Sequence, residues 1–260
     1  MYTKAQEIID NEKYAVISIA GMRGTGKSYL GAHLDFKQKV DLALYIDVVG
    51  AFKKERQDLD FLDIDYIPKE KQIKYILNKA FQSETKELIL DISLLSREEM
   101  VEFIDILSNC LIQLDKKISL VIDEIGEVLE QEGKYYSHGL ERIIRIGRNK
   151  NILFVVMITQ RLQKVNKHAI ALSDFYIFFK TLHNLDRKAI KEILGYNSDE
   201  FKKLDTKLKT LNVGEYIITN GLDIFNKTKN LELEEQNKKL SKQELLISGY
   251  EKLKKLKWGV

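Results

Sequence analysis

Apolar residues along the chain follow two patterns that alternate. Short, nearly continuous apolar runs occur at residues 14–20, 42–49, 88–93, 118–122, 152–158, 175–179 and 215–219. Runs of this kind are typical of strands buried on both faces of a sheet. Between them, apolar side chains recur at helical spacing over residues 28–34, 69–81, 96–114, 135–148 and 186–194. The alternation predicts an α/β fold in which helices cover both faces of a mostly parallel sheet.

Two stretches depart from this alternation. Residues 53–65 are charged and irregular, which predicts a loop. Residues 227–260 carry nine lysines against five glutamates, with Leu246, Tyr250 and Leu253 at helical spacing. We therefore expect a main domain over residues 1–226 and a lysine-rich helical tail over 227–260. The tail either packs on its own domain with its lysines in water or docks on a neighbouring subunit or on DNA.

Composition narrows the class of protein only slightly. The chain has 42 basic and 39 acidic side chains, and the resulting net charge of +3 does not by itself indicate nucleic acid. Cys110 is the single cysteine, so an internal disulfide is excluded, and its apolar surroundings predict a buried thiol. No apolar leader begins the chain, and residues 152–158 are too few to span a bilayer. These features predict a cytoplasmic protein without a membrane span.

The main chemical motif lies between the first expected strand and the first expected helix. It fits the pattern Gly-x-x-x-x-Gly-Lys-[Ser/Thr], in which backbone N–H groups surround the phosphates of a nucleotide. The lysine neutralises the β- and γ-phosphates, the serine hydroxyl binds Mg²⁺, and the helix N-terminus favours the phosphate charge. The expected nucleotide-binding residues are Gly21, Met22, Arg23, Gly24, Thr25, Gly26, Lys27, Ser28 and Tyr29.

Two adjacent carboxylates follow the expected strand 118–122. Asp123 stands at the strand end, where it suits Mg²⁺ beside Ser28. Glu124 can face the γ-phosphate and act as general base toward water, which a hydrolase needs and a kinase does not. Asp91 also ends an expected strand, but it lacks a second carboxylate. We therefore prefer Asp123 as the metal ligand and expect Asp91 to cap a loop or helix.

A glutamine follows the expected strand 152–158. If that strand lies next to the one before Asp123, the amide of Gln160 reaches the γ-phosphate or the attacking water. Gln160 would then distinguish bound ATP from ADP, whereas an isolated glutamine at this position would be an ordinary surface residue.

Three arginines precede the same strand at intervals of three residues. A helix would place Arg142, Arg145 and Arg148 along one side. They could act on the ATP of a neighbouring subunit as arginine fingers, or bind nucleic acid backbone. The alternative is a solvated helix face with local ion pairs, for example to Glu141.

Taken in this order, these segments resemble the HerA/FtsK superfamily of DNA-pumping ATPases. The similarity covers roughly residues 14–226. It is most specific in residues 147–161, a Gly-Arg pair followed by a short linker, an apolar strand and Thr-Gln-Arg. Leu90-Asp91-Ile92-Ser93 and the late Leu211-Asn212-Val213-Gly214-Glu215 turn are similar to further family segments. Leu162 departs from the family, which often has proline there, and this leaves the path of the loop open.

The resemblance implies a RecA-like P-loop NTPase fold and an Mg²⁺-dependent ATPase. It places Lys27 and Ser28 on phosphate and metal, Asp123 on the metal, Glu124 as base and Gln160 as sensor. It further implies a homo-oligomeric ring, usually a hexamer, with sites between subunits and Arg148 first among the candidate fingers. The expected partner is double-stranded DNA, together with a capsid, portal or membrane-complex protein. A viral member would work in the host cytoplasm or in the virion.

Two other functions stay open at this stage. Zonula-occludens-toxin-like assembly proteins of filamentous phage share much of the pattern and act on a protein-coated filament. Relatives of that type usually carry a membrane span after the ATPase domain, and none is expected here. A small-molecule kinase or nucleotide switch shares the phosphate loop alone.

Overall fold

The computed structural model describes residues 4–131, 133–221 and 224–229. These residues contain nine strands in one sheet, in the order β3-β4-β2-β5-β6-β1-β7-β8-β9. The strands through β7 are parallel, whereas β8 and β9 are antiparallel to their neighbours. The strands are β1 (Ala15–Ala20), β2 (Leu42–Asp47), β3 (Asp60–Asp63), β4 (Glu87–Asp91), β5 (Ile118–Ile122), β6 (Ile152–Thr159), β7 (Phe175–Phe179), β8 (Glu215–Thr219) and β9 (Ile224–Lys229).

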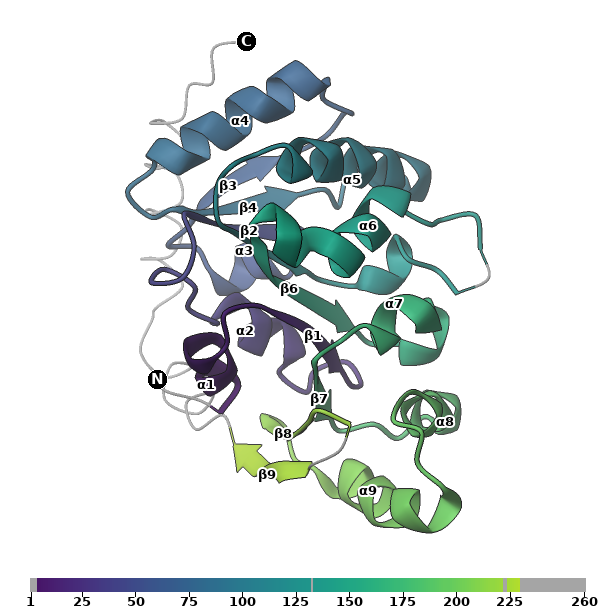
Figure 1. The fold of residues 1–260 in the computed structure, drawn as a ribbon. Helices are drawn as coiled ribbons and strands as arrows, with labels where there is room; N and C mark the ends of the chain where they lie inside the picture. The colour runs from purple at the N-terminus through teal and green to yellow at the C-terminus, as the bar shows by residue number, and fades with distance from the viewer. Residues whose placement is uncertain (1–3, 132, 222–223, 230–260) are drawn as a thin grey trace, which may run out of the picture.

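Helices cover both faces of the sheet, as Figure 1 shows with α1 and α2 on one side and α5, α6 and α7 on the other. The helices are α1 (Lys4–Asn11), α2 (Lys27–Ala32), α3 (Phe52–Glu55), α4 (Glu70–Gln82), α5 (Arg97–Ile112), α6 (His138–Ile146), α7 (Lys167–Ala171), α8 (Asn184–Ile193) and α9 (Ser198–Thr210). Short 3-10 turns are η1 (Ile125–Glu127), η2 (Gly147–Lys150) and η3 (Leu162–Lys164). No helix among the described residues is long and apolar enough to cross a bilayer.

The two faces of the sheet bury separate apolar clusters because side chains alternate along each strand. In β2, Leu44 and Ile46 join the cluster under α4 to α9, whereas Ala43 and Tyr45 join the cluster under α1 to α3. Cys110 of α5 is fully buried in the first cluster, as its apolar surroundings predicted. The expected α/β architecture is confirmed.

The structure differs from the sequence-based expectation mainly at the edges. Residues 53–65 are not a plain loop, because they contain α3 and the four-residue strand β3. Aspartates begin and end β3, so its sequence lacks an apolar run; such charges are common in edge strands. The helix expected over 135–148 is shorter, beginning after the N-cap Ser137 and giving way to η2. β9 runs across the expected domain boundary at residue 226, and residues 230–260 of the tail lie outside the described residues.

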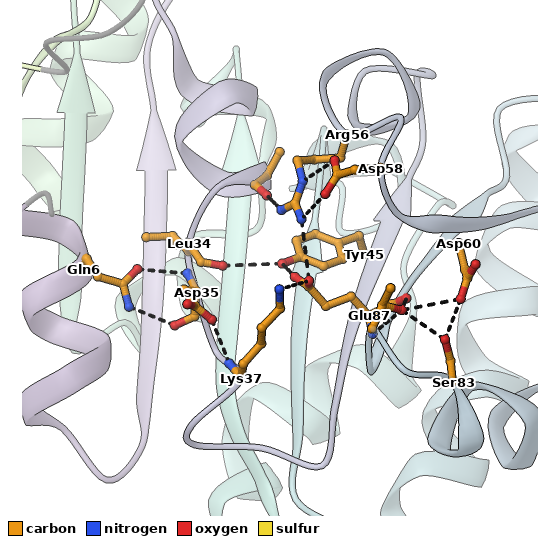
Figure 2. Close-up of polar contacts among 12 residues, drawn as sticks. Gln6, Leu34, Asp35, Lys37, Tyr45, Arg56, Asp58, Asp60, Ser83 and Glu87 are labelled. Atoms are coloured by element: carbon orange, nitrogen blue, oxygen red, sulfur yellow. Dashed lines mark hydrogen bonds and ion pairs between the residues drawn. The ribbon is translucent and has the colours of Figure 1, made fainter. Parts of the chain in front are cut away.

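A buried polar cluster fixes the far end of α2, the helix that follows the phosphate loop. Figure 2 shows Lys37, Tyr45 and Arg56 converging on the carboxylate of Glu87. Arg56 also donates a 2.6 Å hydrogen bond to the carbonyl of Ala32, the last residue of α2. A cation at a helix C-terminus satisfies free carbonyls and favours the helix dipole. The cluster therefore ties α2 to strands β2 and β4.

Candidate functional site

The candidate phosphate loop joins β1 to α2 at the carboxyl edge of the sheet. Gly26 has φ of 104°, in the left-handed region where a side chain is strained. At Gly21 a Cβ atom would lie 2.6 Å from the Cβ of Phe179 on the neighbouring strand β7. The loop is also fixed by a hydrogen bond from Met22 N to Lys180 O and by one from Gly214 N to Thr25 O, both 2.9 Å. These contacts give the loop a defined curvature and explain the need for glycine.

Lys27 begins α2 and points back into the loop. Its ammonium donates a 2.9 Å hydrogen bond to the carbonyl of Met22, and only 4% of the residue is exposed. Burial lowers the pKa of Lys27, although the charges of Glu124 and Asp123 act in the opposite direction. The lysine and the two carboxylates therefore form one electrostatic unit.

Ser28 and Asp123 meet across the gap between α2 and the end of β5. The Ser28 hydroxyl lies 3.2 Å from Asp123 Oδ2 and donates to it. Desolvation raises the pKa of the buried Asp123 carboxyl to about 6, and the neighbouring Glu124 and Asp47 charges add to the effect. A hydroxyl and a carboxylate are the hard oxygen ligands that Mg²⁺ prefers, and a divalent cation would relieve the desolvation of Asp123. The two side chains thus fit the expected metal.

Glu124 is held in an unusual backbone conformation directly after Asp123. Its φ of 44° is left-handed, which is rare for a residue with a side chain and marks local strain. Oε1 accepts 3.3 Å hydrogen bonds from Thr159 Oγ1 and from the backbone N–H of Gln160. Oε2 is buried and has no hydrogen-bond partner among the described residues. An unsatisfied buried carboxylate oxygen beside Lys27 is a suitable acceptor for a proton from water.

The strand order explains how Gln160 reaches this carboxylate. β6 lies between β5, which ends before Asp123, and β1, which leads into the phosphate loop. The expected neighbourhood of these strands is confirmed, and it brings Gln160 to the ends of both. Desolvation raises the pKa of Glu124, while the hydrogen bond from Gln160 N and the charge of Lys27 lower it. Glu124 and Gln160, the expected base and the expected sensor, are therefore in direct contact through the backbone of Gln160.

Asp91, the alternative metal ligand, lies elsewhere. It ends β4, and β2, β5 and β6 separate that strand from β1. Its Oδ1 accepts hydrogen bonds from the backbone N–H and the hydroxyl of Ser93, at 3.0 and 2.6 Å. This geometry supports the expected role of Asp91 as a cap of the loop.

Arg145 and Arg148 lie near the start of β1, at the opposite edge of the sheet from the phosphate loop. Arg142 and Arg145 are on α6, whereas Arg148 is in η2, just before β6. Arg145 lies 3.7 Å from Glu141, and the Arg148 guanidinium lies 5.1 Å from the ring centre of Tyr14, which precedes β1. A strand of six residues separates Tyr14 from the loop, a length of about 20 Å. Arg148 therefore cannot reach the phosphate loop of its own subunit.

Sequence reasoning missed three contributors to the site. Thr159 supplies a hydroxyl to Glu124, Phe179 supports Gly21, and Gly214 donates to the phosphate loop from the turn before β8. Thr159 and Gly214 were noted only as parts of family-like segments, and their roles depend on strand pairing. Phe179 carried no signal beyond an apolar strand.

Asp123 provides a test of the electrostatics of the site. Its pKa of about 6 in the folded chain exceeds the ordinary value of 3.8, so the folded state binds more protons between these values. Stability therefore falls as pH rises from about 4 to about 6, and the loss at pH 7 is on the order of 3 kcal/mol. Asp123→Asn removes this loss because its amide carries no charge to desolvate. The amide oxygen can still accept the hydrogen bond from the N–H of Glu124.

Urea denaturation in EDTA without nucleotide, between pH 4.5 and 8, measures the effect. We expect Asp123→Asn to be more stable than wild type at pH 7 and the difference to shrink as pH falls. Equal stabilities across this range would show that burial of the carboxylate has no energetic consequence.

Comparison with known proteins gives a clear result at the level of structure. No protein-family model and no curated protein matches the chain. Among solved structures, B204 of Sulfolobus turreted icosahedral virus 2, a genome packaging NTPase solved with AMPPCP, has a TM-score of 0.60 and 15% identity; the match covers 84% of this chain and 97% of B204. The chain has the fold of this ATPase.

Two further structures agree. B204 of Sulfolobus turreted icosahedral virus, described as a DNA-packaging ATPase, has a TM-score of 0.58 and 16% identity, covering 83% of this chain and 96% of its own. VirB4 of Thermoanaerobacter pseudethanolicus has a TM-score of 0.60 and 11% identity, covering 80% and 87%. The P-loop ATPase fold that the sequence predicts is therefore confirmed over most of the chain.

Proposed function

We propose that this chain is an ATPase that hydrolyses ATP at the site formed by α2, β5 and β6. The observation that carries the proposal is the buried, unpartnered Oε2 of Glu124 beside Lys27 and behind the phosphate loop. In this reaction Lys27 neutralises the terminal phosphates, while Ser28 and Asp123 would hold Mg²⁺. The metal would supply charge neutralisation at the phosphates.

The oxygen of the attacking water bonds to the γ-phosphorus, and Glu124 accepts the proton that this water loses. The bond from this phosphorus to the β-phosphate bridging oxygen breaks, which yields ADP and phosphate. The backbone N–H of Gln160 donates a hydrogen bond to the Glu124 carboxylate. The side chain of Gln160 is therefore suited to orient the water or the γ-phosphate. Loss of the γ-phosphate would change the contacts of Gln160, and this would signal hydrolysis to the rest of β6.

We further propose that the active form is a ring of identical subunits. Arg148 cannot act in its own subunit, so a role in catalysis requires a neighbour. Large apolar side chains surround the nucleotide edge and are exposed to solvent: Met22, Val49, Leu94, Leu182 and Val213 are 39–71% exposed. Exposed apolar groups around a site support its burial by another subunit. A hexamer is the size that the family resemblance suggests.

Movement of double-stranded DNA is the work that this ATPase would drive. The similar solved structures include packaging enzymes of viruses, and the fold is shared over most of this chain. A capsid, portal or membrane-complex protein would then be the docking partner of the ring. The deciding experiment measures the ATPase rate with and without duplex DNA while the oligomer is sized in ATP. Stimulation by DNA supports a translocase, whereas hydrolysis indifferent to DNA of any length supports the assembly-protein alternative.

Arg148→Ala tests the subunit contact. We expect it to lower turnover about a thousandfold, the usual effect of losing an arginine finger, without weakening ATP binding. Mixing it with Lys27→Met subunits should restore part of the activity, because a mixed interface combines an intact phosphate loop with an intact Arg148. Lys150→Ala, on the same turn, is the matched control.

Turnover of Arg148→Ala near that of wild type would assign the role to Arg145 or Arg142. Failure of the mixture to recover activity, with both variants assembled, would contradict action between subunits.

A further inference from the structure

Arg97 is a basic residue at a helix position that does not favour one. It is the first residue of α5, directly after the N-cap Ser96, where the helix dipole favours acidic side chains. Glu98 and Glu99 follow it and fit that preference. The guanidinium is only partly exposed, with 32% of the side chain accessible. A contact outside α5 must therefore account for its position.

That contact is η1, the turn that follows Glu124. One guanidinium nitrogen of Arg97 donates to the carbonyls of Gly126 and Glu127, at 3.3 and 3.4 Å. Nε forms an ion pair with the carboxylate of Glu127 at 2.8 Å, without hydrogen-bond geometry, and the other terminal nitrogen lies 3.7 Å from the carboxylate of Glu130. The guanidinium plane lies over the ring of Tyr135, with 4.0 Å from its central carbon to the ring centre. The guanidinium of Arg97 thus holds the η1 region by binding backbone carbonyls, by pairing with two carboxylates and by stacking on Tyr135.

The turn that Arg97 holds begins at the strained Glu124. The N–H of Glu127 donates to the carbonyl of Glu124 at 3.0 Å, so the start and end of η1 are directly linked. A left-handed residue with a side chain is strained and persists only where its surroundings fix it. If Gly126 and Glu127 lose their guanidinium partner, the backbone of Glu124 is free to relax.

The residues directly after η1 are linked to the segment that follows Gln160. Gln131 N donates to Lys164 O at 2.7 Å, and Asn166 N donates to Leu129 O at 2.8 Å. Glu130, which pairs with Arg97, also forms an isolated bridge with Val165. The η1 segment therefore connects the loop after the carboxylates with the loop after the sensor.

We infer that Arg97 is a positioning residue for ATP hydrolysis, which holds η1 so that Glu124 Oε2 faces the attacking water. This inference rests on the proposed function, since it assigns a task to the same carboxylate. Arg97 would act through η1, since its contacts are with Gly126, Glu127, Glu130 and Tyr135. Its loss should slow the chemical step and leave nucleotide binding intact, because Lys27 and Ser28 lie on α2 and not on η1.

Arg97→Lys is the test variant because it keeps one positive charge but cannot bind two carbonyls and stack at once. A displacement of a catalytic group by about 1 Å can lower the rate about a hundredfold. We expect kcat to fall between about 10-fold and 100-fold while the Kd for ATP changes less than about twofold. Lys134→Met is the matched control, since Lys134 lies over the same Tyr135 ring and pairs with Glu98.

A double-mutant cycle with Glu124→Gln then separates positioning from a general loss of structure. Single-turnover rates are measured for wild type, each single variant and the double variant, with thermal unfolding as a check on folding. If Arg97 acts through Glu124, Arg97→Lys adds little to the defect of Glu124→Gln. The same fold-loss in both backgrounds, or a parallel loss of ATP affinity, overturns the inference.

Glu127→Gln provides a second, independent variant that weakens the clamp from the side of η1. It should show a smaller loss of kcat and the same lack of additivity with Glu124→Gln. Wild-type protein that hydrolyses no ATP would refute the proposed function and this inference together. Wild-type hydrolysis with full activity in Arg97→Lys would refute the inference alone.

Discussion

Glu124→Gln is expected to bind ATP as well as wild type and to hydrolyse it about 10²–10⁴-fold more slowly, which is the usual contribution of a general base. The substitution keeps an oxygen that can accept from Thr159 Oγ1 and Gln160 N, so the local backbone should hold. It replaces the unpartnered Oε2 with an amide group that takes up no proton. Removal of a negative charge near the phosphates should leave the ATP affinity equal or slightly higher.

The measurement combines nucleotide titration with steady-state and single-turnover hydrolysis. Glu70→Gln on α4 is the matched control, because Glu70 is an exposed glutamate paired with Lys74 and remote from the site. Turnover of Glu124→Gln within a few-fold of wild type would remove Glu124 from the role of base. Asp123 would not be a substitute, since the Ser28 hydroxyl and the N–H of Glu124 already donate to its carboxylate.

The local chemistry of the site could be predicted from the sequence because each motif is short. The phosphate loop, the Asp123-Glu124 pair and Gln160 each follow an apolar run, and in a parallel sheet the ends of such runs meet at one edge. The capping box of Ser96 with Glu99 is equally local, since it involves residues three apart. These features depend on local spacing and on one topological rule.

The contacts that organise those motifs could not be predicted in the same way. The left-handed φ of Glu124 and the reach of Arg97 to η1 depend on tertiary packing between segments that follow β4 and β5. Likewise, nothing in an apolar run such as residues 175–179 shows that Phe179 will lie against Gly21. β3 was missed for the opposite reason, because an edge strand with acidic ends lacks the apolar pattern of a buried one.

The position of Arg148 could be predicted from the sequence only in part. It precedes β6, and parallel strands all begin at the same edge, so its distance from the phosphate loop followed from the expected fold. The stack with Tyr14 did not, because it depends on β6 pairing with β1. The topology therefore supports an arginine that serves a neighbour and excludes one that serves its own site.

Lys27→Met is expected to weaken ATP binding by about a hundredfold or more, which corresponds to about 3 kcal/mol. Lys27 is the buried cation of the loop, and a charge-assisted hydrogen bond to phosphate is stronger than the neutral bond that it makes to Met22 O. Methionine fills a similar volume without a donor, so the phosphates would lose a partner that water cannot replace in a buried site. Fluorescent-nucleotide titration measures the change.

Lys13→Met is the matched control for this variant. Lys13 is exposed and precedes β1, at the opposite end of the strand that leads into the phosphate loop. Nucleotide affinity of Lys27→Met close to that of Lys13→Met would place the triphosphate elsewhere on the chain.

The effect of Lys27→Met on the carboxylates distinguishes it from Glu124→Gln. The charge of Lys27 lowers the pKa of Glu124 against the effect of burial, so its removal should raise that pKa further. The base must be deprotonated to act, so the hydrolysis rate falls below the pKa of Glu124. At saturating ATP, the residual rate of Lys27→Met should therefore begin to fall at a higher pH than the rate of wild type does. Lys27→Met then loses affinity and shifts the acid limb of the pH profile, whereas Glu124→Gln keeps affinity and loses that limb altogether. Two variants within one site would thus separate binding of the triphosphate from attack on it.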